Sequence, residues 1–345
     1  MLALLLKLQP HIQRLLFRLK VAILRLMDRF SPGWGLRKRF PWLDTFISRI
    51  MSWTKKSKHV DIYSWAKPKD LIAKVRFHSL SFRLLLSKRE PLMSSGVSYE
   101  LLTNGVWEPN TSEVFYNSIQ PGQVVIDIGA NIGYHSILAG KLVGPSGKVL
   151  AFEPDPYSFE LLSKNLFMNG LEGIVIPINK AAGEANSLKR LFLSEENSGD
   201  HHLFDSKDGR SSIEVECVRL DDYLLKNFAP LVQKISAVKI DIQGYEAKAC
   251  QGMTGLFSKN SPTLFIEYEP GTLTSAGSSA SELLLLLEKS GYVFHEIKEH
   301  ATINFLSPMT FEQLLRVPST EGFNLFCKKD GTATNNRDHR DSKHE

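Results

Sequence analysis

The sequence has 345 residues, 43% hydrophobic and 23% charged, as in ordinary globular proteins that bury a substantial core. Its net charge of +5 conceals an asymmetry, because residues 1–95 hold 20 Lys and Arg against 5 Asp and Glu, whereas the remainder holds 22 against 32. The three cysteines, Cys217, Cys250 and Cys327, are too few and scattered for a disulfide framework or a metal site, which favours a reducing, cytoplasmic location.

Residues 1–95 are predicted to form a basic amphipathic helical extension. Between residues 2 and 30, Lys7, Arg14, Arg25 and other bases share one helical stripe, and leucines and isoleucines form the opposite face. No window of about 18 uncharged residues occurs, so a membrane span is not predicted. The bases throughout also disfavour a signal peptide.

Three partners are open for this extension. A basic amphipathic helix with nearby tryptophans can bind an anionic membrane surface, here through residues 1–60 and peripherally on the inner face of the membrane. Packing on the protein itself, or on a second copy as an oligomer contact, is equally favoured, and nucleic acid is the least favoured partner. Residues 69–88 read as another basic helix before Pro91, and the loose break at 94–96 marks the expected domain boundary.

Residues 96–329 alternate strand and helix patterns and predict an α/β domain. At its start, residues 99–107 read as a short hairpin. Residues 111–119 read as a helix capped by Asn110 or Thr111.

Residues 124–134, VVIDIGANIGY, predict a strand, a tight loop and the start of a helix that continues to residue 142. Asp127 lies at the carboxyl end of the strand, where open α/β sheets bind ligands. Gly129 and Gly133 allow the backbone to turn sharply and to approach a ligand closely. The loop is therefore a candidate ligand cradle, unless it is an ordinary structural turn.

Two ligand classes compete for this loop. The dinucleotide motif G-x-G-x-x-G fits poorly, because Asn131 and Tyr134 stand where the second and third glycines belong. S-adenosylmethionine carries no phosphate and has a cationic sulfonium. An acidic loop bent by glycine therefore suits S-adenosylmethionine better.

The next strand strengthens an adenosine interpretation. Residues 147–155 read as a strand that ends at Glu153 and Pro154. Glu153 follows Gly129 by 24 residues, close to the spacing of about 20 at which an acid binds ribose hydroxyls.

The pattern continues with a helix over 157–169 and a third strand over 174–179. The small residues Ala181 and Ala182 follow this strand and leave room for a flat ring. Residues 188–193 and 213–219 then alternate like paired strands around a polar insert.

The insert contains His201 and His202. Adjacent loop histidines are more often solvated than catalytic, but a neutral imidazole could take a proton near pH 7. A second acidic strand end follows at residues 238–246, VKIDIQGYE, where Asp241 and Glu246 flank a glycine bend. An acidic helix start stabilised by the helix dipole is the structural alternative there.

The remaining elements complete a sheet and its cover. Strand patterns occupy residues 263–269, 292–297 and 323–327, and a helix pattern occupies 281–290. The tail, residues 330–345, is polar without an apolar period and is predicted to be disordered.

Six stretches together resemble the FkbM family of S-adenosylmethionine-dependent methyltransferases. They are VVIDIGANIGYHS, VLAFEPDPYSFELLSKNLFMNGL, INKAAGE, VRLDDYL, VKIDIQGYE and PTLFIEYEP, and the resemblance runs from about residue 100 to 328, some two thirds of the chain. It implies the Rossmann-like class I methyltransferase fold, with a seven-stranded, mostly parallel sheet flanked by helices. It also implies methyl transfer, usually to oxygen.

The resemblance assigns roles to particular residues. Trp107 and Glu108 are expected near the cofactor, and Asp241, then Glu246 or a histidine, is the expected base. Acid-rich strand ends could also hold Mg²⁺, although no spacing demands it. The residues expected to bind S-adenosylmethionine are Asp127, Gly129, Ala130, Asn131, Gly133, Tyr134, Glu153, Pro154, Ala181 and Ala182.

The sequence thus predicts O-methylation of a hydroxyl on a glycan, a glycolipid or a small molecule. One alternative is an NAD-linked or nucleotide-sugar oxidoreductase, which the missing glycines disfavour. Another is a non-catalytic, membrane-associated adaptor that retains the fold. Gln243 keeps this alternative open, because many family members have Glu there.

Overall fold

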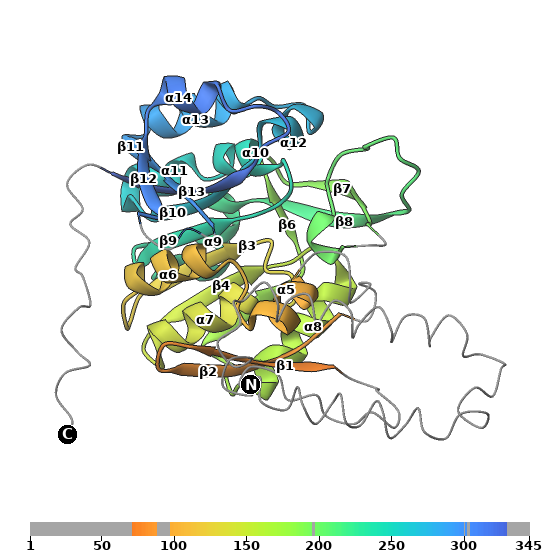
Figure 1. Ribbon diagram of the computed structural model, residues 1–345, viewed down its shortest axis with the longest axis vertical. Helices are drawn as coiled ribbons and strands as arrows, with labels where there is room; N and C mark the ends of the chain where they lie inside the picture. The colour runs from red at the N-terminus through yellow and green to blue at the C-terminus, as the bar shows by residue number, and fades with distance from the viewer. Residues whose placement is uncertain (1–70, 88–96, 195–196, 300, 302–303, 330–345) are drawn as a thin grey trace, which may run out of the picture.

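The computed structural model describes residues 71–87, 97–194, 197–299, 301 and 304–329 (Figure 1). Of the extension predicted over residues 1–95, residues 1–70 and 88–95 lie outside these ranges, including residues 1–60 with their predicted membrane, oligomer and nucleic-acid partners. The predicted tail over 330–345 lies outside them as well. No helix among the described residues combines the length and apolar character needed to cross a membrane.

One eight-stranded sheet forms the centre of the domain (Figure 1), in the order β12-β11-β13-β10-β9-β3-β4-β5. The five strands from β10 to β5 run parallel, and β13 lies antiparallel between β10 and β11. The strands are β3 Val124–Ile128, β4 Lys148–Phe152, β5 Val175–Ile178, β9 Ile235–Ile240, β10 Thr263–Tyr268, β11 Tyr292–Ile297, β12 Leu306–Met309 and β13 Phe323–Lys329.

This architecture confirms the predicted class I methyltransferase fold, with β12 as one additional edge strand. The strand β3 is buried along its whole length, because helices cover both faces of the sheet. One face carries α5 Val97–Asn104, α6 Pro109–Ser118, α7 Tyr134–Val143 and α8 Pro156–Met168. The other carries α9 Leu220–Val232, α10 Glu246–Gln251, α11 Thr254–Asn260, α12 Pro270–Ser275, α13 Ala280–Lys289 and α14 Phe311–Leu315.

A smaller three-stranded sheet adjoins the carboxyl edge of the main one. It consists of β6 Ala181–Gly183, β8 Ser212–Arg219 and β7 Ser187–Phe192. The antiparallel pairing of β7 with β8 confirms the predicted strand pair. The insert between them contains the short 3₁₀ helix η1, Ser198–Asp200.

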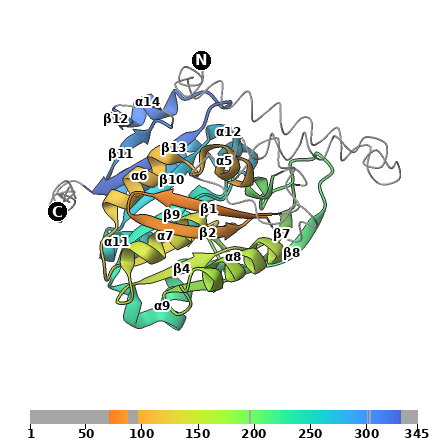
Figure 2. The ribbon, with the colours of Figure 1, turned by 60° about the horizontal axis from the view of Figure 1, so that its bottom comes forward.

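The predicted basic helix over residues 69–88 is wrong. This segment is the hairpin of β1 Ile72–Phe77 and β2 Leu80–Leu85. In β1, the buried residues Ala73 and Val75 alternate with more exposed ones, and β2 shows a similar alternation. A period of two residues is that of a strand. Figure 2 shows the hairpin over α7 and α8, so its inward side chains join the core of the domain.

The start of the domain also differs from expectation. Residues 97–104 form α5 instead of part of a hairpin, and α6 begins after Glu108, which supplies no side-chain cap. The expected caps are engaged elsewhere: the Asn110 side chain donates to the Lys298 carbonyl at 2.6 Å, and the Thr111 hydroxyl donates to Glu299 at 2.5 Å.

Asn165 on α8 holds the hairpin to the domain. Its fully buried amide accepts a hydrogen bond from the Leu85 amide at 2.6 Å and donates to the carbonyls of Leu85 at 3.1 Å and Ile132 at 2.8 Å. We expect Asn165→Ala to lower the free energy of unfolding by about 3 kcal/mol, because three buried backbone groups lose their partner. Urea denaturation measures the loss, and Lys164→Ala, at an exposed position on the same helix, should change it by less than about 0.5 kcal/mol.

Candidate functional site

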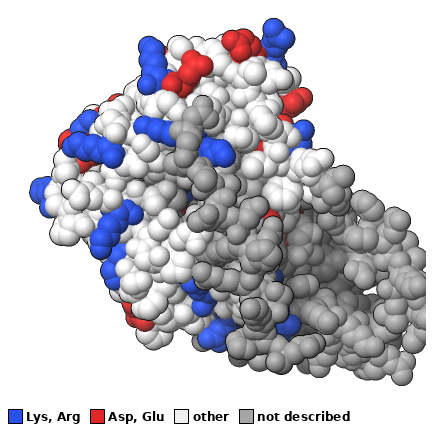
Figure 3. All heavy atoms as spheres, turned by 90° about the vertical axis from the view of Figure 1, so that its left-hand side faces the viewer, with Lys and Arg blue, Asp and Glu red and all other residues white. Residues whose placement is uncertain are grey.

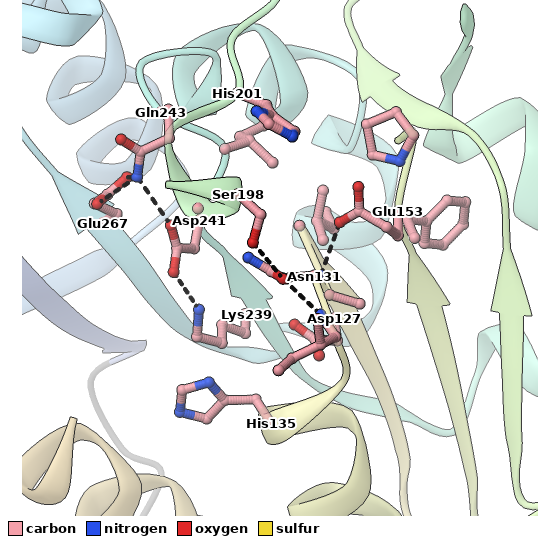
Figure 4. Close-up of a pocket in the computed structure, with 18 of the residues that line it drawn as sticks. Asp127, Asn131, His135, Glu153, Ser198, His201, Lys239, Asp241, Gln243 and Glu267 are labelled. Carbon is pink, nitrogen blue, oxygen red and sulfur yellow. Dashed lines mark hydrogen bonds and ion pairs between the residues drawn. The ribbon is translucent and has the colours of Figure 1, made fainter. Parts of the chain in front are cut away.

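A cavity of about 350 Å³ opens at the carboxyl ends of β3, β4, β9 and β10 (Figure 4). The loop after β3 and the η1 insert form two of its walls, and the segment between α5 and α6 forms a third. All the residues predicted to bind the cofactor line this cavity except Gly133. Trp107 and Glu108, expected close to the cofactor, line it as well.

The glycine corner after β3 is packed against the tip of β9. Gly129 has a φ of +83°, and a Cβ added there would lie 1.9 Å from the Asp241 carbonyl oxygen. Its amide and that of Ala130 donate to the Phe152 carbonyl at 3.0 and 2.9 Å. The corner therefore brings the tips of three strands together, as only glycine allows.

Gly133 has a different role from the one predicted. It precedes α7 with a φ of +96°, and an added Cβ would lie 2.6 Å from a methyl carbon of Leu162 on α8. It is therefore required for close packing of α7 on α8 and does not line the cavity.

Glu153 follows the tip of β4 and is 6% exposed. Its carboxylate accepts hydrogen bonds from the amides of Asn131 at 2.7 Å and Asp155 at 2.8 Å. Burial raises the Glu153 pKa to about 8, although these two bonds oppose the shift. The side chain is thus fixed at the cavity wall beside the glycine corner (Figure 4).

Asp127 at the end of β3 is 1% exposed, and only one of its two carboxylate oxygens has a hydrogen-bond partner among the described residues. Its Oδ2 accepts a hydrogen bond from the Ser136 hydroxyl at 2.6 Å, whereas Oδ1 has no partner among the described residues. Burial raises the Asp127 pKa, and the nearby ammonium of Lys239 opposes the rise. A cationic donor in the cavity would satisfy the open oxygen.

Lys239 and Asp241 form a buried ion pair at the tip of β9, with 2.7 Å between Nζ and Oδ2. Burial alone would raise the Asp241 pKa, but the Lys239 charge and the hydrogen bonds with Lys239, Glu267 and Gln243 together outweigh it, and the pKa is lowered. Asp241 is therefore ionised at neutral pH. Lys239 was not among the predicted site residues, although a lysine inside the otherwise apolar run Val238 to Ile240 is a signal for a buried, paired charge.

Gln243 bridges two acids that belong to neighbouring strands. Its Nε2 donates to the Glu267 carboxyl oxygens at 2.9 and 2.8 Å and lies 3.4 Å from Asp241 Oδ1. Burial and the Asp241 charge raise the Glu267 pKa well above its usual range. A glutamate at position 243 would add a third carboxyl group to this cluster.

Of the other predicted catalytic residues, only His201 lines the cavity. Its Nδ1 accepts a hydrogen bond from the Ser194 amide at 3.0 Å. Glu246 instead accepts hydrogen bonds from the amides of Ile242 at 3.0 Å and Gly244 at 3.2 Å and is 1% exposed. Glu246 therefore holds the bend after β9.

His202 also lies away from the cavity. It stacks on Phe204 with 4.5 Å between ring centroids, and its Nε2 is 3.3 Å from an Asp200 oxygen. Its neighbour His201 reaches the cavity because successive residues of the extended segment point to opposite sides. Among the described residues, no group of three or more His, Cys, Asp or Glu side chains is arranged to hold a metal.

One face of the described part of the molecule carries mixed charge. On the face shown in Figure 3, lysines and arginines of the described part are interspersed with acids and form no continuous band.

Residues 127–294 match the family model described as the methyltransferase FkbM domain. Among curated proteins, the chain is 28% identical over 158 residues to methyltransferase sdnD of Sordaria araneosa, which covers 37% of this chain and 60% of the relative. It is 24% identical over 147 residues to the hexuronic acid methyltransferase AglP of Haloferax volcanii, covering 43% and 56%. The chain thus spans less than two thirds of each of these relatives.

Solved structures give weaker matches. The methyltransferase FkbM from Methylobacillus flagellatus KT has a TM-score of 0.37 and 15% identity, over 63% of this chain and 50% of that one. The family model covers the glycine corner, Glu153, Lys239 and Asp241, which line the cavity, whereas the cavity residues Trp107 and Glu108 lie before the matched range. Residues 127–294 of this chain belong to the FkbM family of methyltransferase domains.

Proposed function

We propose that the protein is an S-adenosylmethionine-dependent methyltransferase that methylates a hydroxyl group of a glycan, a glycolipid or a small molecule. The observation that carries this proposal is that the Gly129 corner and Glu153 lie at adjacent strand tips and open into the same cavity. The Asn131 amide joins them by its bond to Glu153.

The cavity's chemistry fits this cofactor. Glu153 is placed to hydrogen-bond ribose hydroxyls, and the small Ala181 and Ala182 leave space for a flat base at the same end. Asp127 offers an unpartnered carboxylate oxygen to a cation. A dinucleotide fits less well, because the corner has Asn131 where the pyrophosphate motif requires glycine.

When bound, S-adenosylmethionine supplies a methyl group on a positively charged sulfur. The residues of this chain would then orient an acceptor hydroxyl, accept its proton and keep water away. Asp241 is the proposed proton acceptor, because it is ionised, lines the cavity and is fixed by Lys239. Among the predicted histidines, His201 remains a second candidate.

The hydroxyl acceptor is supported by the surroundings of Asp241. Carboxyl, amide and ammonium groups from Asp241, Glu267, Gln243 and Lys239 offer the mixture of donors and acceptors that a polyhydroxylated ligand can use. The relative AglP is named for methylation of hexuronic acid, which also carries sugar hydroxyls. A membrane-associated extension over residues 1–60 would bring such a site close to glycolipids.

Cofactor selectivity tests this proposal. We expect the full chain to bind S-adenosylhomocysteine in the micromolar range by isothermal titration calorimetry and to bind NAD at least about 100-fold more weakly, because the loop lacks two pyrophosphate glycines. Substituting Glu153→Ala should abolish most of the nucleoside affinity. Tighter binding of NAD would instead support the oxidoreductase alternative.

The acceptor can then be found with a labelled methyl group. Cell lysate incubated with the protein and radiolabelled S-adenosylmethionine should show label in the glycan or glycolipid fraction. Label in no fraction, despite cofactor binding, would favour the non-catalytic adaptor.

A further inference from the structure

Two buried atoms without partners face each other on the wall formed by α6 and α7. They are Glu108 Oε2 and His135 Nε2, which lie 3.9 Å apart and have no hydrogen-bond partner among the described residues. His135 is only 5% exposed. Buried polar atoms without partners are rare in folded proteins, and these two line the cavity, so they indicate a place for a ligand group.

Glu108 is held in this position at a cost. It has a φ of +44°, in the left-handed region that residues other than glycine seldom adopt. Its other oxygen, Oε1, accepts a hydrogen bond from the Asn324 side chain of β13 at 3.0 Å. This tether fixes the side chain at the cavity wall, with Oε2 facing His135 Nε2.

The pair can accept hydrogen bonds from one donor. Burial, and then the Lys239 charge, lower the His135 pKa well below its usual value, so the imidazole is neutral and its Nε2 can accept. The 3.9 Å gap is too long for a direct bond but allows a nitrogen to lie about 2.9 Å from both atoms.

The unpartnered carboxyl oxygens of the cavity favour a cationic donor. Glu108 Oε2 and Asp127 Oδ1 both lack a hydrogen-bond partner among the described residues, and Lys239, the buried lysine of the cavity, is already paired with Asp241. The amino-acid end of S-adenosylmethionine and of its product carries a primary ammonium group.

We propose that Glu108 and His135 together bind the primary ammonium group at the amino-acid end of the cofactor. This inference deepens the proposed function and rests on it. It makes the leader segment between α5 and α6 a selectivity element, through which the chain prefers nucleosides with an α-amino acid over nucleosides that lack it.

A proton should accompany this binding. Burial raises the Glu108 pKa to about 7; the charge of Lys239 and the Asn324 bond lower it, and the charges of Asp241 and Glu299 raise it. The His135 imidazole, which faces Glu108, is neutral and adds no charge beside it. An ammonium beside Glu108 lowers its pKa, so binding near pH 7 releases part of a proton, whereas above about pH 8 Glu108 is already ionised and releases none.

The test compares two ligands that differ in the amino-acid end. S-adenosylhomocysteine carries it, and 5′-methylthioadenosine lacks it. By calorimetry on the full chain, Glu108→Gln should lower the affinity for S-adenosylhomocysteine by about 10- to 100-fold. It should change the affinity for methylthioadenosine by less than about 3-fold. His135→Phe, which preserves the ring contact with Phe115 at 5.3 Å, should show the same selectivity.

The matched control is Glu113→Gln, which removes a carboxylate from α6 outside the cavity and should leave the affinity for both ligands unchanged. Titrations at pH 7 in buffers of different ionisation enthalpy should show a proton release with S-adenosylhomocysteine that exceeds that with methylthioadenosine. This excess should disappear in Glu108→Gln.

If Glu108→Gln and His135→Phe lowered the affinity for both ligands equally, the inference would be overturned and the pair would have only a structural role. Unchanged affinity for S-adenosylhomocysteine in both variants would also overturn it. If the unmodified chain binds neither ligand, the proposed function itself fails, an outcome that the unmodified protein alone reveals.

Discussion

Replacing Asp241 with Asn is expected to reduce methyl transfer by about 10²- to 10⁴-fold, the range typical of losing a general base. Asp241 lines the cavity, and Lys239 keeps its carboxylate ionised at neutral pH. The amide of Asn can occupy the same space but cannot take a proton from an acceptor hydroxyl. The measurement is the transfer of radiolabelled methyl to the fraction of lysate that accepts it.

Binding of S-adenosylhomocysteine should be retained in Asp241→Asn, because the expected ribose contact, Glu153, is unchanged. The control is Asp222→Asn, an exposed acid on α9 paired with Arg219, which should transfer methyl at the normal rate. An unchanged rate in Asp241→Asn would remove this carboxylate from the mechanism and leave His201 as the candidate base.

Replacing Gly129 with Ala is expected to abolish cofactor binding and to lower the free energy of unfolding by about 2–5 kcal/mol. The added Cβ would lie 1.9 Å from the Asp241 carbonyl oxygen, so the tips of β3 and β9 must separate until the contact exceeds 3.0 Å. The positive φ of +83° adds strain that glycine avoids. Calorimetric binding of S-adenosylhomocysteine and urea denaturation measure the two effects.

The variant Gly170→Ala separates the cost of backbone strain at a positive φ from the cost of a steric clash of the added Cβ. Gly170 has a φ of +64°, but nothing lies within 4 Å of its added Cβ. This variant should lose only about 1–2 kcal/mol and retain cofactor binding. If Gly129→Ala were as stable as Gly170→Ala and bound the cofactor normally, the close contact between the two strand tips would not be required.

Local patterns were sufficient to predict most of the elements that surround the site. The apolar run before Asp127, the glycine turn and the helical spacing after it are adjacent in sequence, and each follows from the conformational preferences of neighbouring residues. The same holds for Glu153, because a strand of ordinary length places it at the sheet edge. The hairpin over 72–85 was misread because its basic composition masked a two-residue alternation.

The sequence by itself determined the nucleoside half of the candidate site: the corner at Gly129, the acid at Glu153 and the small residues at Ala181 and Ala182. Only the tertiary structure decided the roles of the remaining charged groups. It turned Glu246 toward backbone amides, paired Lys239 with Asp241, and fixed Glu108 at the cavity wall by a hydrogen bond from Asn324, which is 216 residues away in the chain. The physical reason is that burial and the partner of a charged group set its protonation and reach, and both depend on contacts between distant segments.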